Sequence, residues 1–237
     1  MMNDEWLGRP NHSSFIIHHS SFIIPLNPSR LEKFRRVAAC RQPDLTVILE
    51  NVTDMHNIGA VMRSCDSVGV REVFVLNTEA HLQTDYIVAG KRTSMGTRKW
   101  MDVHYYIDPE KCFERVRQNC HRILAAWLGE GAKGLHELDL TQPTAFLFGN
   151  EHSGISEPVL KMTDGNFIIP QVGMAESLNI SVACAVTLYE TYRQRKAAGF
   201  YDENLPLPPE EQEALFQEYV RRHEKRTSGR KRIKLTK

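Results

Sequence analysis

Several runs of apolar residues in this chain do not alternate with polar ones, and segments with helical periodicity separate them. The runs are LTVILE at 45–50, EVFVL at 72–76 and TAFLF at 144–148. A strand with one solvated face alternates between apolar and polar residues, whereas a strand covered on both faces is apolar throughout. We therefore predict an α/β fold in which helices flank both faces of a parallel sheet.

The remaining expected elements continue this alternation. We predict further strands at Met101–His104, Arg122–Leu128 and Asn166–Ile169, and helices at Ile58–Val68, Pro109–Asn119, Glu157–Met162 and Ser181–Ala198. Glycines follow two of these helices, as is common at helix C-termini. The face of the last helix that we expect to be buried carries Val182, Ala185, Val186 and Tyr189. Small residues at 183–185 would allow close packing there, including against a second subunit.

The first 26 residues contain a tandem repeat, because HSSFII occurs at 12–17 and again at 19–24. A secretory signal peptide needs a basic segment and a small-residue cleavage site, and neither is present. A short amphipathic arm is one interpretation. We favour a non-conserved or disordered extension and leave residues 1–26 out of the fold prediction.

A basic helix is predicted within residues 27–43, before the first strand. Ser29 and Glu32 have the spacing of a capping box, and helical spacing relates the apolar residues Leu31, Phe34, Val37 and Ala38. The basic residues near this stripe are Arg30, Lys33, Arg35, Arg36 and Arg41. They form either a solvated face, which we favour, or a patch that contacts phosphates.

The composition changes sharply after Gly199. Residues 202–218 hold six acidic residues and no basic ones, whereas residues 221–237 hold nine Lys or Arg against one Glu. We interpret residues 200–237 as an acidic hinge followed by a basic tail, in a helical or disordered extension. The tail is either a solubilising terminus or a non-specific contact to RNA phosphates.

Composition also excludes several classes of protein. The chain of 237 residues is 41% hydrophobic, which is enough for a packed core. It has no apolar run of about 18 residues, so we expect no membrane-spanning segment. Its five cysteines include no C-x-x-C pair and its ten histidines show no metal-ligand spacing. We therefore expect no metal site and a reducing, cytoplasmic environment.

The glycine-rich segment Gly129–Gly134 matches the pattern G-x-G-x-x-G of dinucleotide-binding proteins. Such a motif must open a helix whose N-terminus binds a pyrophosphate. The following LHELDLTQP leaves too little room for that helix before the next strand. We therefore interpret the segment as a surface turn, and a nicotinamide-dependent dehydrogenase has no other support.

Three segments place polar side chains beside glycines or small residues near predicted strands. They are NIGAVMR at 57–63, FGNEHSG at 148–154 and IPQVGMAESLN at 169–179. Loops at the carboxyl ends of parallel strands often bind ligands in α/β proteins. Taken singly, each segment also fits a purely structural role. Asn57, Ser177 and Asn179 suit helix caps, and Glu151 suits an exposed turn.

In this order and spacing, the three segments resemble the signature motifs of the SpoU/TrmH family within the SPOUT superfamily of RNA methyltransferases. The resemblance extends from about Arg41 to Arg195 and is closest to the TrmH-type tRNA (guanosine-2′-O-)-methyltransferases. RQPDLT at 41–46 and SLNISVA at 177–183 are similar to that subgroup. The resemblance assigns residues 44–199 to a SPOUT methyltransferase domain.

The resemblance implies a deep C-terminal trefoil knot, a rare exception to the usual rules of chain connection. It also implies a homodimer, with each active site near the subunit interface. The cofactor would be S-adenosyl-L-methionine, bent within the knot and held largely by backbone groups. The residues expected at the cofactor are Ala126, Gly149, Ile169, Pro170, Met174, Leu178 and Asn179.

For catalysis, the resemblance implies 2′-O-methylation of a guanosine in tRNA, with guanosine 18 of the D-loop as the usual target. The residues expected to take part are Arg63, Asn57, Glu151, Ser177 and Asn179. Guanidinium groups stay protonated in proteins, so we interpret Arg63 as a charge stabiliser and phosphate clamp. The proton of the 2′-hydroxyl would pass to the phosphate, to water or to Glu151. The resemblance also implies RNA contacts by Arg41, Arg193 and Arg195.

Two other functions stay open. A 2′-O-methyltransferase of ribosomal RNA is the first, but such relatives often carry an extra N-terminal RNA-binding domain. Only about 40 residues precede the first predicted strand here, and many belong to the repeat, which favours tRNA. A catalytically inactive RNA-binding protein is the second. It is disfavoured by the joint presence of five residues, which are Asn57, Arg63, Glu151, Ser177 and Asn179.

Overall fold

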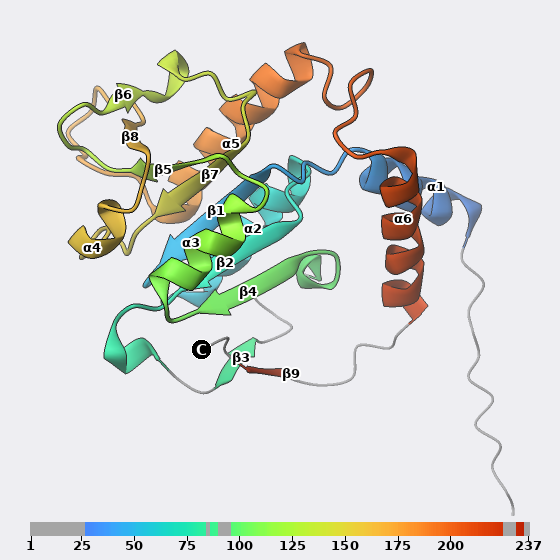
Figure 1. Ribbon diagram of the computed structural model, residues 1–237, viewed down its shortest axis with the longest axis horizontal. Coiled ribbons are helices and arrows are strands. Elements are labelled where there is room, and N and C mark those ends of the chain that lie inside the picture. The colour runs from blue at the N-terminus through green and yellow to red at the C-terminus, as the bar shows by residue number, and fades with distance from the viewer. Residues whose placement is uncertain (1–26, 84–85, 90–95, 225–230, 235–237) are drawn as a thin grey trace, which may run out of the picture.

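The computed structural model describes residues 27–83, 86–89, 96–224 and 231–234. Its centre is a seven-stranded sheet with the strand order β4-β2-β1-β7-β5-β8-β6 (Figure 1). Every pair of neighbouring strands in this sheet is parallel, which confirms the predicted α/β class. The expectations for residues 1–26, 225–230 and 235–237 fall outside the described residues.

The strands of this sheet are β1 (Leu45–Glu50), β2 (Glu72–Leu76), β4 (Asp102–Tyr106), β5 (Arg122–Ala126), β6 (Lys133–Gly134), β7 (Thr144–Phe148) and β8 (Gly165–Ile168). The bounds of β1, β2 and β7 are those predicted from their apolar runs. All residues of β1 and β7 are buried, as strands covered on both faces require. Strand β5 ends at Ala126 rather than Leu128, and the side chains of Trp127 and Leu128 are exposed beyond it.

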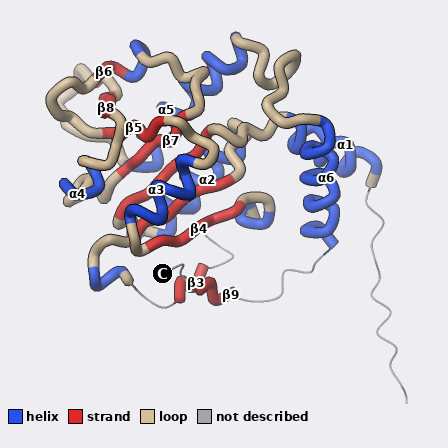
Figure 2. Tube along the Cα trace, viewed as in Figure 1, coloured by secondary structure: helices blue, strands red, loops and turns tan. Residues whose placement is uncertain are grey.

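Helices cover both faces of the large sheet, as Figure 2 shows. Helices α2 (Met55–Ser67) and α5 (Ile180–Ala197) pack on the face that carries Val47 and Leu49. Helices α3 (Pro109–Arg117) and α4 (Glu157–Leu160) pack on the face that carries Ile48. Successive residues of β1 therefore enter two different cores, because side chains alternate across a strand.

Two helices begin earlier than predicted, and other residues cap them. Helix α2 is capped by Asp54, whose Oδ1 accepts a hydrogen bond from the backbone N of His56 at 2.8 Å. Asn57 therefore lies in the first turn of α2, and its expected capping role is wrong. Helix α1 (Pro28–Ala39) is capped by Asn27 rather than by Ser29. Pro28 follows the cap, where its fixed φ suits the first helical position.

The buried face of α5 also differs from the predicted one. It carries Ile180, Cys184, Thr187, Leu188 and Thr191. Val182, Val186 and Tyr189 are 47%, 36% and 53% exposed, so the prediction that they face the core is wrong. Helix α5 is apolar on more than one side, and its packing against α2 buries the side that carries Ile180, Cys184 and Leu188.

The terminal helices α1 and α6 (Pro209–Glu224) pack side by side at one end of the molecule (Figure 1). Their shared core consists of Phe34, Ala38, Leu215, Phe216 and Tyr219. The prediction of an acidic hinge is therefore wrong from residue 209 onward. Glu210 and Glu211 occupy the first turn of α6, where the helix dipole favours negative charge.

A second sheet pairs β3 (Tyr86–Ala89) with β9 (Lys231–Lys234) in antiparallel register. Neither strand is predicted from the sequence. The register opposes Tyr86 to Lys234 and Ala89 to Lys231. This pairing returns the end of the chain to the segment between β2 and β4.

The glycine-rich segment at 129–134 forms a turn, as predicted. It ends in β6 and is followed by a 3-10 turn at Leu135–Glu137, with no helix before Pro143. Gly131 has a φ of 74°, a conformation that favours glycine. The segment therefore lacks the helix that a dinucleotide-binding motif must open.

Candidate active site

Hydrogen bonds join one side chain from each of the three sequence motifs. The Nδ2 of Asn57 donates to Oε1 of Glu151, and the Nδ2 of Asn179 donates to Oδ1 of Asn57 at 3.2 Å. Asn57 is 94 residues from Glu151 and 122 residues from Asn179 in the sequence. Asn57 thus connects the motif after β1, the motif after β7 and the start of α5.

Local structure explains why these amides are available to each other. Because Asp54 caps α2, the side chain of Asn57 has no capping function. Asn179 caps α5 through its Oδ1, which accepts hydrogen bonds from the backbone N and the hydroxyl of Ser181 at 2.9 and 2.6 Å. Its Nδ2 is then left to donate to Asn57. Asn179 therefore fixes the helix and the site together.

The turn that carries Glu151 is tight. A Cβ on Gly149 would lie 2.3 Å from the backbone of Gly154, so only glycine fits there. The Oδ1 of Asn150 accepts hydrogen bonds from the backbone N atoms of His152 and Ser153 at 2.8 and 3.2 Å. The carboxylate of Glu151 lies in this turn, between Asn150 and Gly154, and stays largely exposed.

Arg63 is close to Asn57 in the sequence, and Ser177 is close to Asn179. Neither is a partner in the hydrogen bonds from Asn57 to Glu151 and from Asn179 to Asn57. Arg63 is exposed on α2, six residues after Asn57. At about 100° per residue, this spacing turns its side chain roughly 120° around the helix from Asn57. Ser177 is exposed in the loop before α5. Among the described residues, the hydrogen bonds that link Asn57, Glu151 and Asn179 do not extend to Ser177.

The residues predicted to hold a cofactor lie at the carboxyl ends of β5, β7 and β8. Ala126 ends β5 and pairs with Phe167, Gly149 follows β7, and Ile169 follows β8. The loop at 169–179 also carries the predicted residues Pro170, Met174 and Leu178. Met174 is 100% exposed, whereas Leu178 is half-buried.

Three exposed apolar residues that were not predicted as site residues lie in the loops that follow β5 and β8. Trp127 and Leu128 follow β5 with 38% and 79% exposure, and Val172 is fully exposed. Loops at this edge are where α/β proteins bind ligands. The signal was hidden because Trp127 and Leu128 continue the apolar run of β5 and were assigned to that strand.

Two of the three arginines predicted to bind RNA are buried, with 1% exposure for Arg41 and none for Arg195. Arg41 donates to Asp66 and to the Tyr219 hydroxyl, each at 2.7 Å. Arg195 donates to Asp44 at 2.6 Å. The prediction of direct RNA contacts is therefore wrong for both, because their guanidinium groups are enclosed and bound within the fold. Arg193 is exposed and forms an ion pair with Glu190.

A family comparison places these motifs in a known context. Residues 44–189 match the profile of the SpoU rRNA Methylase family. The chain belongs to the SpoU rRNA methylase family. The match includes the whole large sheet and all three motifs.

Individual relatives support this membership. The chain is 40% identical over 194 residues to the tRNA (guanosine(18)-2′-O)-methyltransferase of Thermus thermophilus, and the alignment covers 82% of this chain and 97% of that protein. Its fold matches the TrmH/SpoU tRNA modifying enzyme of A. aeolicus with a TM-score of 0.71 and 33% identity, over 82% and 96% of the two chains. It also matches the SpoU methyltransferase AviRb of Streptomyces viridochromogenes, solved in complex with the cofactor AdoMet, with a TM-score of 0.56 and 28% identity over 66% and 60% of the chains.

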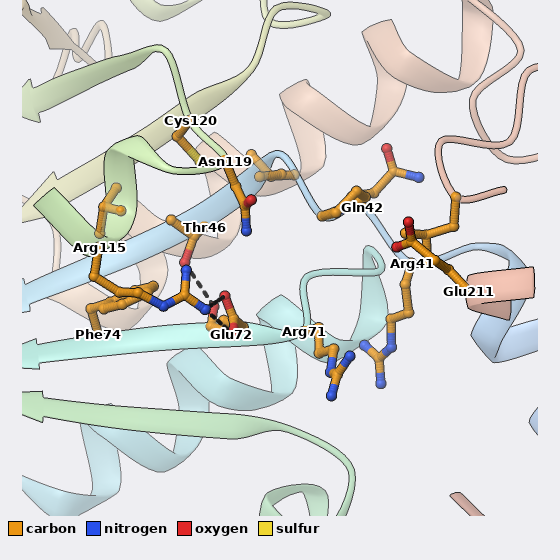
Figure 3. A pocket seen from close by; sticks show the side chains of 14 residues that line it. Arg41, Gln42, Thr46, Arg71, Glu72, Phe74, Arg115, Asn119, Cys120 and Glu211 are labelled. Atoms are coloured by element: carbon orange, nitrogen blue, oxygen red, sulfur yellow. Dashed lines mark hydrogen bonds and ion pairs between the residues drawn. The ribbon is translucent and has the colours of Figure 1, made fainter. Parts of the chain in front are cut away.

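A cavity of about 200 Å³ lies at the N-terminal ends of β1 and β2 (Figure 3). The SpoU family motifs lie at the other, carboxyl ends of the strands. The starts of β1 and β2 line it, and Arg115 forms an ion pair with Glu72 inside it. Burial raises the pKa of Glu72, but the hydrogen bond from His104 and the charges of Arg115 and Arg71 lower it overall. These charges are engaged with one another, so we do not place the active site in this cavity.

The described residues give no sign of a metal centre or of a membrane span. They contain no group of three or more His, Cys, Asp or Glu side chains that could hold a metal ion. None of their helices is long and apolar enough to cross a bilayer. All five cysteines are free thiols.

Proposed function

We propose that this chain transfers a methyl group from S-adenosyl-L-methionine to the ribose 2′-hydroxyl of guanosine 18 in tRNA. The observation that carries the proposal is the hydrogen-bonded set Asn57, Glu151 and Asn179, which unites the three family motifs. The proposal is supported by the Thermus thermophilus relative, which is named a tRNA (guanosine(18)-2′-O)-methyltransferase and aligns over 97% of its own length.

The residues at the carboxyl edge of the sheet suit the cofactor chemically. When bound, S-adenosyl-L-methionine supplies a methyl group on a positively charged sulfur. Its adenine needs apolar cover and main-chain hydrogen bonds, as small-ligand sites usually provide. Ala126, Gly149 and Ile169–Pro170 would contribute backbone groups, and Met174 and Leu178 would contribute apolar surface. The full exposure of Met174 leaves it available for this contact.

Arg63 would act on the substrate side of the site. A fixed positive charge near the 2′-oxygen stabilises the negative charge that develops there and can clamp the adjacent phosphate through two hydrogen bonds. The hydroxyl proton would leave to that phosphate, to water or to the carboxylate of Glu151. The carboxylate of Glu151 is exposed at the turn after β7, where a substrate hydroxyl could reach it.

Asn57, Asn179 and Ser177 would position the other groups. Asn57 donates to Glu151, which fixes one of its oxygens, and Asn179 in turn orients the amide of Asn57. Ser177 would contact the cofactor or the ribose from the loop before α5. Holding reacting groups in line accounts for much of the acceleration in such transfers.

We also propose that the enzyme works as a homodimer through α5. Val182, Val186 and Tyr189 form an exposed apolar surface on this helix. Exposed apolar side chains gathered on one surface are typical of protein interfaces. The same helix begins at Asn179, so an interface there would lie near the active site.

A trefoil knot in the C-terminal part of residues 44–199 is a further part of the proposal. Its support is the position of β8, which lies between β5 and β6 in the sheet although β5 and β6 are consecutive in the chain. The connection at 127–132 must therefore pass around a strand that is added later. The family match at 44–189 supports residue 44 as the start of the domain. Gly199, which follows α5 with a φ of 81°, supports an end at residue 199.

The proposed partner is tRNA, in the cytoplasm. Arg193 is exposed near the end of α5 and suits a phosphate contact. The basic residues of the tail would add non-specific attraction to the RNA backbone, which depends on salt. The free thiols are consistent with a reducing compartment.

Methylation of unmodified tRNA in vitro, followed by mapping of ribose-methylated positions, tests the proposal. Methylation confined to guanosine 18 is expected. Methylation of ribosomal RNA alone would support the alternative that the family description suggests. Binding of tRNA without methyl transfer would support a catalytically inactive RNA-binding protein. The relative that matches over 97% of its length favours tRNA over ribosomal RNA.

A further inference from the structure

A carboxylate beside the turn that carries Glu151 is completely buried. Glu50 is the last residue of β1 and has no exposed surface. Its Oε1 accepts hydrogen bonds from the hydroxyl groups of Ser156 and Thr78 at 2.5 and 3.1 Å. Its Oε2 accepts a hydrogen bond from the backbone N of Ser156 at 3.0 Å.

The burial of this charge needs an explanation. Removing a carboxylate from water is costly unless hydrogen bonds replace its hydration. An apolar side chain of similar volume often stabilises a core better than a buried charged group. The position follows Val47, Ile48 and Leu49, which are buried in apolar cores. A buried carboxylate here therefore suggests a function other than stability.

The next residue extends the same set of contacts. Asn51 has a φ of 53°, in the left-handed region. Its Oδ1 accepts a hydrogen bond from the backbone N of Thr78 at 2.8 Å, and its carbonyl oxygen accepts one from Nδ2 of Asn150, also at 2.8 Å. Glu50 and Asn51 together connect the ends of β1, β2 and β7.

These contacts hold the turn that carries Glu151 from both sides. Asn150, just before Glu151, donates to the carbonyl of Asn51. Ser156, five residues after Glu151, donates twice to Glu50. The segment that carries Glu151 is therefore fixed at both of its ends.

We propose that Glu50 is a positioning residue for methyl transfer, which acts by fixing the turn at 150–156 and with it the carboxylate of Glu151. The inference rests on the proposed function, since it assumes that Glu151 takes part in the reaction. Displacement of a reacting group by about 1 Å can lower a rate by roughly 100-fold, so small movements of this turn matter.

Three variants test the anchoring directly. Glu50→Ala removes the acceptors, Ser156→Ala removes one hydroxyl donor, and Glu50→Gln keeps one carbonyl oxygen and the shape of the side chain. The matched control is Thr46→Val, at the other end of β1. The buried hydroxyl of Thr46 donates to the carbonyl of Glu72 at 2.8 Å, so its loss removes a comparable bond away from the site.

We expect Ser156→Ala and Thr46→Val to unfold at similar temperatures, with only Ser156→Ala lowering the rate of methyl transfer. Glu50→Ala should lower the single-turnover rate by about 10- to 100-fold. Glu50→Gln should recover part of that loss. If Ser156→Ala and Thr46→Val lower the rate equally, the effect is one of stability and the proposal is wrong.

A double-mutant cycle with Glu151→Ala separates positioning from an independent effect. If Glu50 acts through Glu151, the double variant Glu50→Ala/Glu151→Ala should be no slower than Glu151→Ala alone. If the rate losses of the two single variants multiply in the double variant, the proposal is wrong. If Glu151→Ala methylates tRNA at the rate of the unmodified chain, the assumed role of Glu151 has failed instead.

Amide hydrogen exchange gives a readout that does not depend on activity. Glu50→Ala and Ser156→Ala should speed exchange in the segment 150–156, while Thr46→Val should leave that segment unchanged. If Glu50→Ala does not fold, Ser156→Ala still provides both the rate and the exchange comparison. Unchanged exchange in Ser156→Ala and in Glu50→Gln would overturn the anchoring.

Discussion

The Nε of Arg41 donates a 2.7 Å hydrogen bond to the hydroxyl of Tyr219, which joins the segment before β1 to helix α6 across 178 residues of sequence. The same guanidinium donates to Asp66 in α2 and to the carbonyl oxygen of Val70. Arg41 therefore attaches the pair of terminal helices to α2 and to the segment just before β2. It also reaches the end of α2, the helix that carries Arg63.

Replacement of Arg41 should destabilise the fold rather than weaken RNA binding directly. Arg41→Ala leaves Asp66 without its buried partner and should lower the free energy of unfolding by about 3 kcal/mol. Thermal and urea unfolding measure this loss. Gln217→Ala, on the exposed face of α6, is the control and should unfold like the original chain. Equal stability of Arg41→Ala and this control would contradict the structural role.

Arg63 should be essential to methyl transfer without holding the cofactor. Arg63→Ala should lower the single-turnover rate by about 100- to 1,000-fold, because it removes a charge that stabilises the developing alkoxide. Arg63→Lys should retain part of the rate, since it keeps the charge but loses the bidentate geometry. Calorimetric binding of S-adenosyl-L-methionine should be unchanged in both. Arg117→Ala on α3 serves as a control for the loss of a surface arginine.

Asn57 should contribute to methyl transfer through the hydrogen bond that its amide group donates to Glu151. Asn57→Ala removes the hydrogen bond to Glu151 and should lower the rate by roughly 10-fold or more, as expected for a lost bond to a charged group. Asn57→Asp should be worse, because it places a second carboxylate beside Glu151. Single-turnover rates measured for both variants show which of the two is slower. A faster Asn57→Asp than Asn57→Ala would argue against the direct contact.

Stability in acid should depend on Glu190. Hydrogen bonds from Arg193 lower the pKa of Glu190 from 4.5 to about 2, although burial opposes the shift. A lowered carboxyl pKa stabilises the folded state fully above about pH 4.5, and the contribution is lost as the pH falls toward about 2. Urea midpoints between pH 6 and 2 should therefore fall more steeply for the original chain than for Glu190→Gln. If the urea midpoints of the two proteins fall with pH at the same slope, Glu190 does not make this contribution to stability.

The exposed surface of α5 should hold two subunits together. Val186→Glu introduces a charge among Val182 and Tyr189 and should shift the sedimentation coefficient from that of a dimer to that of a monomer. Gln217→Glu, on the exposed face of α6, should leave the dimer intact. Sedimentation velocity distinguishes these outcomes. A monomeric original chain would rule out the proposed interface.

The sequence alone predicted the three buried strands β1, β2 and β7 of the large sheet. The runs at 45–50, 72–76 and 144–148 form strands with the predicted bounds, because strands buried on both faces must be apolar throughout. The sequence also predicted Asn57, Glu151 and Asn179 as residues of the active site. The hydrogen bonds that join them span 94 and 122 residues, so their contact depended on how the strands are ordered in the sheet.

Other features could be decided only by the tertiary structure. Arg41 and Arg195 look like surface arginines in sequence, but Asp66 and Asp44 are brought beside them and allow their burial. Helix α5 is apolar on more than one side, and only its packing against α2 selects the buried one. Sequence periodicity reports which side chains avoid water. The partner that covers a charge or an apolar face comes from a distant part of the chain, and folding alone supplies it.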